Sequence, residues 1–193
     1  DTRELERALR LQIYSEYEKL YNFAPWDDRK FLLNIVYKAE YELILSALRR
    51  MSTSRALPPD DIITDFFREH SKVDVDAISQ SGDFGELMSA VKGSVFEDIL
   101  RSLPRKPDGL PDYSQASSAL ENSYYSMVYA YLAKGYKGLG KKVLIESIGT
   151  QADLLNIVYI LRMRRLLGPS PRIPGLLIPV RYKLTSEFIT ELA

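Results

Sequence analysis

Hydrophobic residues recur at intervals of three and four along most of this chain, with polar residues between them. That period is the period of one face of an α-helix. The two-residue alternation of a half-buried strand is not convincing anywhere in the sequence. The pattern therefore predicts an all-α fold of seven to nine helices joined by proline-rich loops.

The first two predicted helices cover residues 5–21 and 28–50. Asp27 is the expected N-cap of the second helix, which is apolar nearly all round. Its polar residues form one narrow stripe, in which Lys38 and Glu42 are spaced to pair. The expected buried face of the first helix consists of Leu5, Leu9, Ile13, Tyr17 and Leu20.

Further helices follow, separated by prolines and glycines. Residues 71–83 have a weak pattern, which indicates partial order. Gly149 is expected to end one short helix, and Thr150 with Asp153 resembles a capping box that begins the next. The predicted ranges are 60–68, 84–103, 114–134, 143–148, 153–167 and 185–192.

The hexapeptide Leu-Leu-Asn-Ile-Val-Tyr occurs twice, at 32–37 and at 154–159. Each copy lies on an apolar segment that runs into an arginine-rich end. Such an identity within one chain favours a duplicated structural unit. We predict one helical lobe at 1–82 and a second at 83–193, with 104–112 as an internal linker, and we expect a further piece upstream of residue 1.

Composition excludes several classes of function. The 26 basic and 26 acidic residues balance, whereas nucleic-acid binders usually have a basic excess. The absence of cysteine removes disulfides, thiolate metal sites and cysteine nucleophiles, and is compatible with a cytoplasmic location. No run of about 18 apolar residues predicts a membrane span.

Two motifs suggest chemistry, and each has a simpler interpretation. Residues 135–142 fit G-x-x-x-x-G-K, but Lys142 stands where a phosphate-binding loop needs Ser or Thr, so we interpret them as a solvated connection. Asp60, Asp61 and Asp65 resemble the aspartate-rich motif of Mg²⁺-dependent all-α enzymes. A helix N-terminus explains the same acidic residues, because its free N–H groups favour negative charge.

The remaining polar positions indicate structure more than catalysis. The single histidine, His70, is expected on the surface or capping a helix. Asn34 and Asn156 interrupt apolar helices, and a buried amide must be hydrogen-bonded, so we expect them to fix helix register, together with Asp153. We expect no catalytic, cofactor-binding or metal-binding residue.

Two features hint at a partner. Tyrosines crowd one segment, 124–136, and tyrosine is favoured at surfaces that contact both protein and solvent. A cluster of positive charge is expected to contact an acidic partner, or else to be a solvated helix end. It consists of Arg162, Arg164, Arg165 and Arg172.

The segment from Asp153 to Arg164 resembles the D-x-x-N-I/L…R motif of the C subunit of V-type and A-type ATPases, whose eukaryotic equivalent is called the d subunit. The segments 120–125 and 177–184 are also similar to that family. The repeat of the motif within 28–50 matches the family's internally repeated, three-lobed helical fold. The chain would then represent two of the three lobes.

The resemblance implies a non-catalytic connector that sits on the cytoplasmic end of the membrane rotor ring and receives the central stalk. Its partners would be other ATPase subunits, with no cofactor, and its location would be peripheral to the membrane. Two alternatives stay open on the residues alone: a helical interaction adaptor of another pathway, and a Mg²⁺-dependent all-α enzyme.

Overall fold

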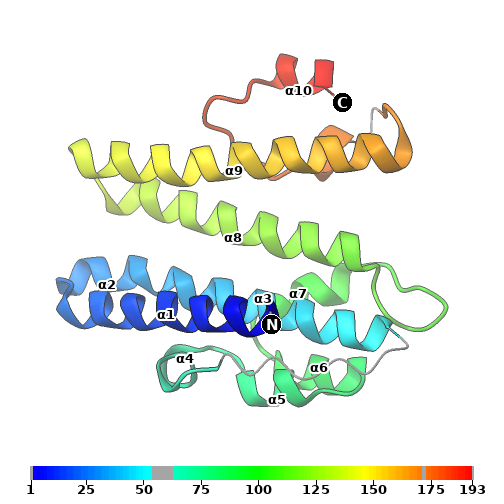
Figure 1. Cartoon of the computed structure of the whole chain (residues 1–193), viewed down its shortest axis with the longest axis horizontal. Coiled ribbons are helices and arrows are strands. Elements are labelled where there is room, and N and C mark those ends of the chain that lie inside the picture. The colour runs from blue at the N-terminus through cyan, green and yellow to red at the C-terminus, as the bar shows by residue number, and fades with distance from the viewer. Residues whose placement is uncertain (1, 54–62, 171–172, 193) are drawn as a thin grey trace. The chain divides into compact units, whose positions relative to one another are not determined.

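A computed structural model describes residues 2–53, 63–170 and 173–192 (Figure 1). The described residues form α-helices and one 3-10 turn without a β-strand, which confirms the all-α prediction. The chain divides into two compact units, Asp1–Ser117 (unit 1) and Ser118–Ala193 (unit 2). These two units are defined by contacts within the structure, and their boundary differs from that of the predicted lobes 1–82 and 83–193. The lobes are inferred from the repeated hexapeptide, and they stay a prediction.

Unit 1 is built around one central helix, α3, which packs against α4, α5 and α6. Its helices are α1 (Thr2–Phe23), α2 (Trp26–Leu32), α3 (Asn34–Ser52), α4 (Asp65–His70), α5 (Val75–Gln80), α6 (Phe84–Ala90) and α7 (Val95–Ser102). Because α3 is apolar nearly all round, neighbours on several sides are needed to cover it. Its buried residues are Val36, Glu40, Tyr41, Leu43, Ile44, Leu45, Ala47 and Leu48.

The helix predicted at 28–50 is two helices, α2 and α3, divided at Leu33. The chain stays nearly helical there, because the Leu33 N–H still donates to the Arg29 carbonyl at 3.1 Å. Helix α2 begins at Trp26 after Pro25, so Asp27 lies inside the first turn and is not the N-cap. The expected pair of Lys38 and Glu42 is confirmed, with 3.8 Å between ammonium and carboxylate.

The apolar face predicted for α1 does not point into unit 1. Leu5, Leu9, Ile13 and Leu20 are all more than half exposed. Two tyrosines make the contacts instead: the Tyr14 ring meets the Phe67 ring edge-on, and Tyr21 does the same with Phe66. Aromatic rings supply more contact area than leucines, and they decide which side of α1 faces α4.

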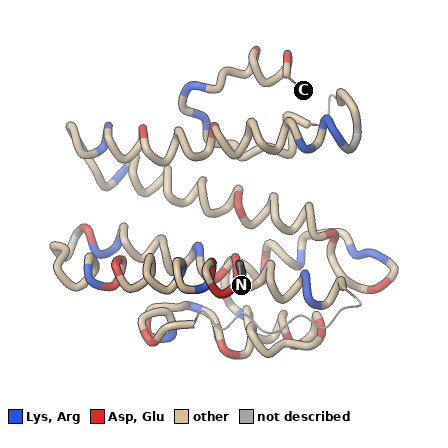
Figure 2. Tube along the Cα trace, in the orientation of Figure 1, with Lys and Arg blue, Asp and Glu red and all other residues tan. Residues whose placement is uncertain are grey.

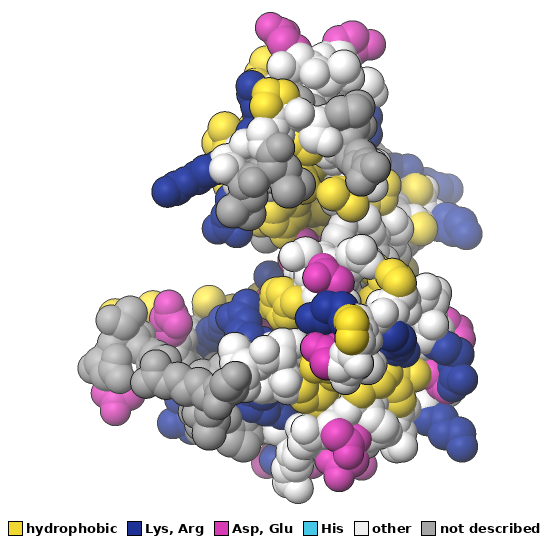
Figure 3. Space-filling view, turned by 90° about the vertical axis from the view of Figure 1, so that its right-hand side faces the viewer, with side chains coloured by type: hydrophobic (Ala, Val, Ile, Leu, Met, Phe, Trp, Pro, Cys, Tyr) yellow, Lys and Arg dark blue, Asp and Glu magenta, His cyan; other side chains and the backbone are white. Residues whose placement is uncertain are grey.

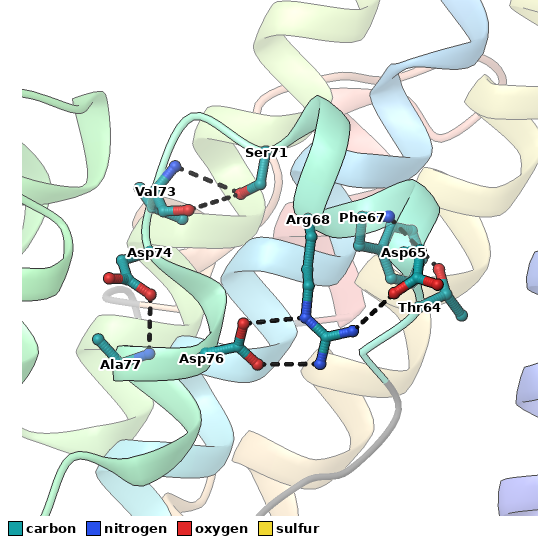
Figure 4. Close-up of polar contacts among 9 residues, drawn as sticks. All are labelled: Thr64, Asp65, Phe67, Arg68, Ser71, Val73, Asp74, Asp76 and Ala77. Carbon is teal, nitrogen blue, oxygen red and sulfur yellow. Dashed lines mark hydrogen bonds and ion pairs between the residues drawn. The ribbon is translucent and has the colours of Figure 1, made fainter.

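Side-chain caps create the short helices of unit 1, and one of them lies where we expected only partial order. Asp74 accepts a hydrogen bond from the Ala77 N–H at 2.9 Å and begins α5 within the weakly patterned segment 71–83 (Figure 4). The helix predicted at 60–68 is described only as α4, which Thr64 caps, because residues 54–62 lie outside the described part.

The helix predicted at 84–103 is also two helices, α6 and α7. The break follows from Gly93, whose φ of 76° no helix accommodates. The N–H of Gly93 donates to the carboxylate of Glu97 at 2.6 Å, which fixes the start of α7. Residues 104–112 contain no helix and lie within unit 1, and their role as a linker inside the second lobe stays a prediction.

Unit 2 consists of most of α8 and the three elements that follow it. The elements are α8 (Tyr113–Gly135), α9 (Gly138–Leu167), η1 (Ile173–Leu176) and α10 (Ser186–Leu192). Thr185 caps α10 as predicted, accepting from the Phe188 N–H at 3.2 Å. The core of the unit lies beneath the second half of α9 and consists of Ile160, Ile173, Leu177, Leu184 and Ile189.

Helix α9 is continuous over 30 residues, so the two short helices predicted at 143–148 and 153–167 are wrong. Gly149 is not a C-cap, and Thr150 and Asp153 do not form a capping box. The segment 138–165 of α9 is long and apolar enough to cross a membrane, a property that the core helices of soluble proteins share.

Candidate functional site

One buried polar group of unit 2 is the carboxylate of Asp153, which is 7% exposed in the middle of α9. Its Oδ1 accepts from the Tyr182 N–H at 3.1 Å. Its Oδ2 accepts from the N–H groups of Lys183 at 2.6 Å and Leu184 at 3.0 Å. Three backbone donors compensate the cost of burying the charge and tie residues 182–184 to the helix.

Asn156 lies one turn further along α9 and is fully buried. Its Nδ2 donates to the Ile178 carbonyl at 3.1 Å, and its Oδ1 accepts from the Ile178 N–H at 2.8 Å. The hydrogen bonds expected of a buried amide are therefore present. Together Asp153 and Asn156 hold the segment 178–184, here called the anchored segment, against α9.

Asn34, at the matching place in the first hexapeptide, bonds differently. Its Nδ2 donates to the Phe31 carbonyl of the preceding turn at 2.7 Å, and the side chain is only half-buried. The second hexapeptide lies 122 residues after the first, so the residue of unit 1 that matches Asp153 is Phe31. Phe31 has no carboxylate. Asn156 therefore makes the expected hydrogen bonds to the backbone of a distant segment, whereas the hydrogen bond of Asn34 is to the preceding turn of its own stretch of chain.

Gly149 permits the close packing that surrounds this site. A Cβ added at Gly149 would lie 2.4 Å from the Tyr129 hydroxyl and 2.5 Å from Cβ of Tyr182. Burial, with a smaller contribution from the charge of Asp153, raises the pKa of the Tyr129 hydroxyl. The glycine thus lets α8 and the anchored segment approach the same turn of α9.

The arginine-rich end of α9 is exposed, as a partner contact would require, at Arg162, Arg164 and Arg165. Arg164 donates from Nη1 to the carbonyl of Leu192 at 3.0 Å, so one of the three also fastens α10. The sequence has no acidic residue between Asp153 and the end of α9, and Figure 2 shows basic residues at that end of the helix. Arg172, the fourth candidate, lies outside the described residues.

The aspartates that suggested a Mg²⁺ site are not seen to converge. Asp60 and Asp61 lie outside the described residues. Asp65 is fully exposed and pairs with Arg68 at 2.9 Å, and Arg68 also pairs with Asp76 at 2.9 Å (Figure 4). Within the described residues, no three His, Asp or Glu side chains gather in a way that fits a metal ion.

His70 and two of the tyrosines are less exposed than expected. His70, the last residue of α4, is half-buried against Tyr21 of α1, with Nδ1 3.0 Å from the Phe66 carbonyl and Nε2 3.1 Å from the Tyr21 hydroxyl. His70 is therefore packed against two aromatic rings at the end of α4 and is not simply a surface residue. Tyr124 and Tyr125 are buried core residues, which removes them from any surface that binds a partner.

Sequence reasoning missed Glu40, a carboxylate on α3 that is 3% exposed. It accepts hydrogen bonds from the Ser71 hydroxyl at 2.6 Å and the Lys72 N–H at 2.8 Å. Burial raises the pKa of Glu40 above its ordinary value, and the two hydrogen bonds oppose that rise. The only sequence signal was its place on the apolar side of α3.

The glycine-rich segment 135–142 spans the end of α8 and the start of α9, with only Tyr136 and Lys137 between the two helices. Helix α8 precedes it, where a phosphate-binding loop needs a strand. Gly138, with a φ of 63°, begins α9. The predicted solvated connection is therefore confirmed only at Tyr136 and Lys137, because residues 138–142 form the start of α9.

Comparison with known proteins identifies the family. A family model described as the ATP synthase (C/AC39) subunit matches residues 1–193. This chain belongs to the ATP synthase (C/AC39) subunit family. It is 30% identical over 176 residues to a protein of Pyrococcus horikoshii that is named as the C subunit of an A-type ATP synthase. That match covers 91% of this chain but 45% of the relative, so the chain spans about half of that protein's length. No solved structure matches the chain significantly.

Proposed function

We propose that this C/AC39 family member is a non-catalytic connector subunit of a rotary V/A-type ATPase. It joins the central stalk to the membrane rotor ring on the cytoplasmic side, and its partners are other subunits of that complex. The match of the family model to residues 1–193 carries the proposal. The likeness to the C subunit of an A-type ATP synthase supports it.

The anchored segment supports a mechanical role. A part that transmits torque must resist local opening, and local opening is disfavoured where backbone groups are buried and hydrogen-bonded. Asp153 and Asn156 together make five such bonds to the backbone of the anchored segment. The arrangement stiffens the scaffold and brings together no set of groups suited to catalysis.

Purification from membranes tests the proposal. The tagged chain, expressed in its own host and extracted in mild detergent, should bring down stalk and ring subunits in constant proportion. Its depletion should lower ATP-driven ion transport while the detached catalytic head keeps hydrolysing ATP. A tagged chain that reaches normal levels yet never associates with those subunits would contradict the proposal.

A further inference from the structure

The two identical hexapeptides turn different faces towards their surroundings. In unit 1, Val36 is 2% exposed and packs with Phe66 and Phe67 of α4. The matching residue in unit 2, Val158, is 37% exposed. In unit 1 a helix thus packs on the valine side of the hexapeptide, and in unit 2 the same side is not covered by a helix of that unit.

The open face of α9 continues on both sides of Val158. Leu154 and Leu161 are each 60% exposed, and the three residues follow at spacings of four and three, so they form one stripe. Arg165, four residues after Leu161, continues the same line. Figure 3 shows hydrophobic and basic side chains side by side on the surface of unit 2, in the upper part of the view. Helix α10 does not cover this stripe, because its Ile189 packs with Ile160 on another side of α9.

The charge at the matching positions is reversed between the two units. In unit 1, Glu40 accepts hydrogen bonds from Ser71 and Lys72, the residues that follow α4. The residue 122 positions later is Arg162, an exposed donor. In unit 1 the donors to Glu40 come from the two residues that follow the helix packed on α3. At Arg162 the roles are reversed, so a segment packed beside it on α9 needs acceptors, and carboxylates suit arginine best.

From these relations we propose that Leu154, Val158 and Leu161, with Arg162 and Arg165, form a docking face for one amphipathic helix of another polypeptide. That helix carries apolar side chains at helical spacing and Asp or Glu residues that meet the two arginines. The proposal rests on the proposed function only in that the helix belongs to a neighbouring ATPase subunit. The stripe is narrow, with Thr150 and Gln151 beside it, whereas a helix lying on a lipid surface needs a broad apolar face.

Single-cysteine labelling tests the docking face directly, because residues 1–193 contain no cysteine. Leu161→Cys probes the stripe, and Ser126→Cys, exposed on α8, is the matched control. In the purified ATPase complex, maleimide should react much more slowly with the first variant than it does in the free chain, and the control should react alike in both. A benzophenone-maleimide probe on the first variant should cross-link to a helical peptide of one other subunit that contains acidic residues.

A charge reversal provides the second arm. Arg162→Glu with Arg165→Glu should keep the wild-type circular dichroism and lower the cross-link yield about tenfold or more, as loss of desolvated charge contacts predicts. Lys142→Glu, near the other end of α9, should leave the yield unchanged.

The outcomes separate this inference from the proposed function. A chain that co-purifies with the ATPase but whose residue 161 stays fully reactive overturns the docking face alone. Cross-links to a second copy, to unit 1 or to lipid overturn it too. A wild-type chain that does not co-purify removes the connector function, and the docking face with it.

Discussion

Asn156 and Ile178 bond to each other in both directions: the side-chain amide of Asn156 donates to the Ile178 carbonyl at 3.1 Å and accepts from the Ile178 N–H at 2.8 Å. Both residues are almost wholly buried. An amide that loses either bond has no water to replace it. This reciprocal pair makes the position intolerant of change, and several consequences can be measured.

Replacing Asn156 with Ala should lower the free energy of unfolding by about 2–4 kcal/mol, because it leaves a buried N–H and a buried carbonyl without partners. Urea denaturation followed by circular dichroism measures the change. Asn34→Ala is the matched control, since its single bond is local and half-buried. It should cost about 1 kcal/mol or less. Equal losses at the two positions would refute a special role for Asn156.

Asp153→Asn should release residues 182–184. An amide can accept on one side only, so at least one of the three N–H donors now faces an NH₂ group, at a cost of about 2–3 kcal/mol. Hydrogen exchange of the Tyr182, Lys183 and Leu184 amides reads this out, and each should exchange faster. Asp112→Asn, at the exposed start of α8, should be nearly neutral because both residues cap helices well.

Gly149→Ala should destabilise unit 2 by about 1–3 kcal/mol, because the added methyl group overlaps the side chains of Tyr129 and Tyr182. Gly140→Ala, in the first turn of the same helix, meets open space. It should be neutral or add about 0.5–1 kcal/mol, since alanine is the better helix former. Thermal denaturation of both variants checks the contrast, and two changes of the same sign would contradict it.

Glu40→Gln should remove a pH dependence. Because burial raises the pKa of Glu40 in the folded state above 4.5, the folded state binds the proton more tightly than the unfolded state. The stability contributed by this group is therefore full below pH 4.5 and is lost as pH rises through the raised pKa. The glutamine variant, whose oxygen still accepts from Ser71 and Lys72, should be the more stable form at pH 7 and equal the wild type near pH 4. Urea titrations at both pH values measure this, and a glutamine variant that is less stable at pH 7 speaks against it.

Tyr14→Ala should destabilise unit 1 by about 2 kcal/mol, because the ring packs edge-on against Phe67 with 4.5 Å between centroids. Leu9→Ala, on the exposed side of α1, should change stability by no more than about 0.5 kcal/mol. Urea denaturation measures both changes in the free energy of unfolding. If Leu9 were buried, as the helical spacing predicts, Leu9→Ala would give the larger decrease.

The sequence predicted what depends on neighbours along the chain. Helical spacing indicated the all-α fold, and Thr185 was recognisable as a cap because its partner Phe188 is three residues away. The need of Asn156 for a hydrogen bond also followed from its residue type and its apolar surroundings. Gly149 misled the prediction, because a glycine that ends a helix and one that admits a neighbouring ring look alike in sequence.

The rest depends on contacts between distant residues. The donors that Asp153 binds lie 29 to 31 residues further along the chain, so its spacing to Thr150 suggested a local cap instead. The two hexapeptides show the same limit most directly. Identical residues bury Val36 in one copy and Asn156 in the other, because the neighbouring helices and the presence of Asp153 decide which face turns inward.

The same long-range ties bear on how unit 2 folds. Until the anchored segment arrives, Asp153 and Asn156 have no backbone partners there, so a partly folded α9 gains little by burying them. Closing a loop of about 30 residues costs conformational entropy, and only the complete set of hydrogen bonds offsets that cost. Helix and segment should therefore form in one cooperative step, and the amides of Tyr182 and Leu184 should open only when the whole unit unfolds.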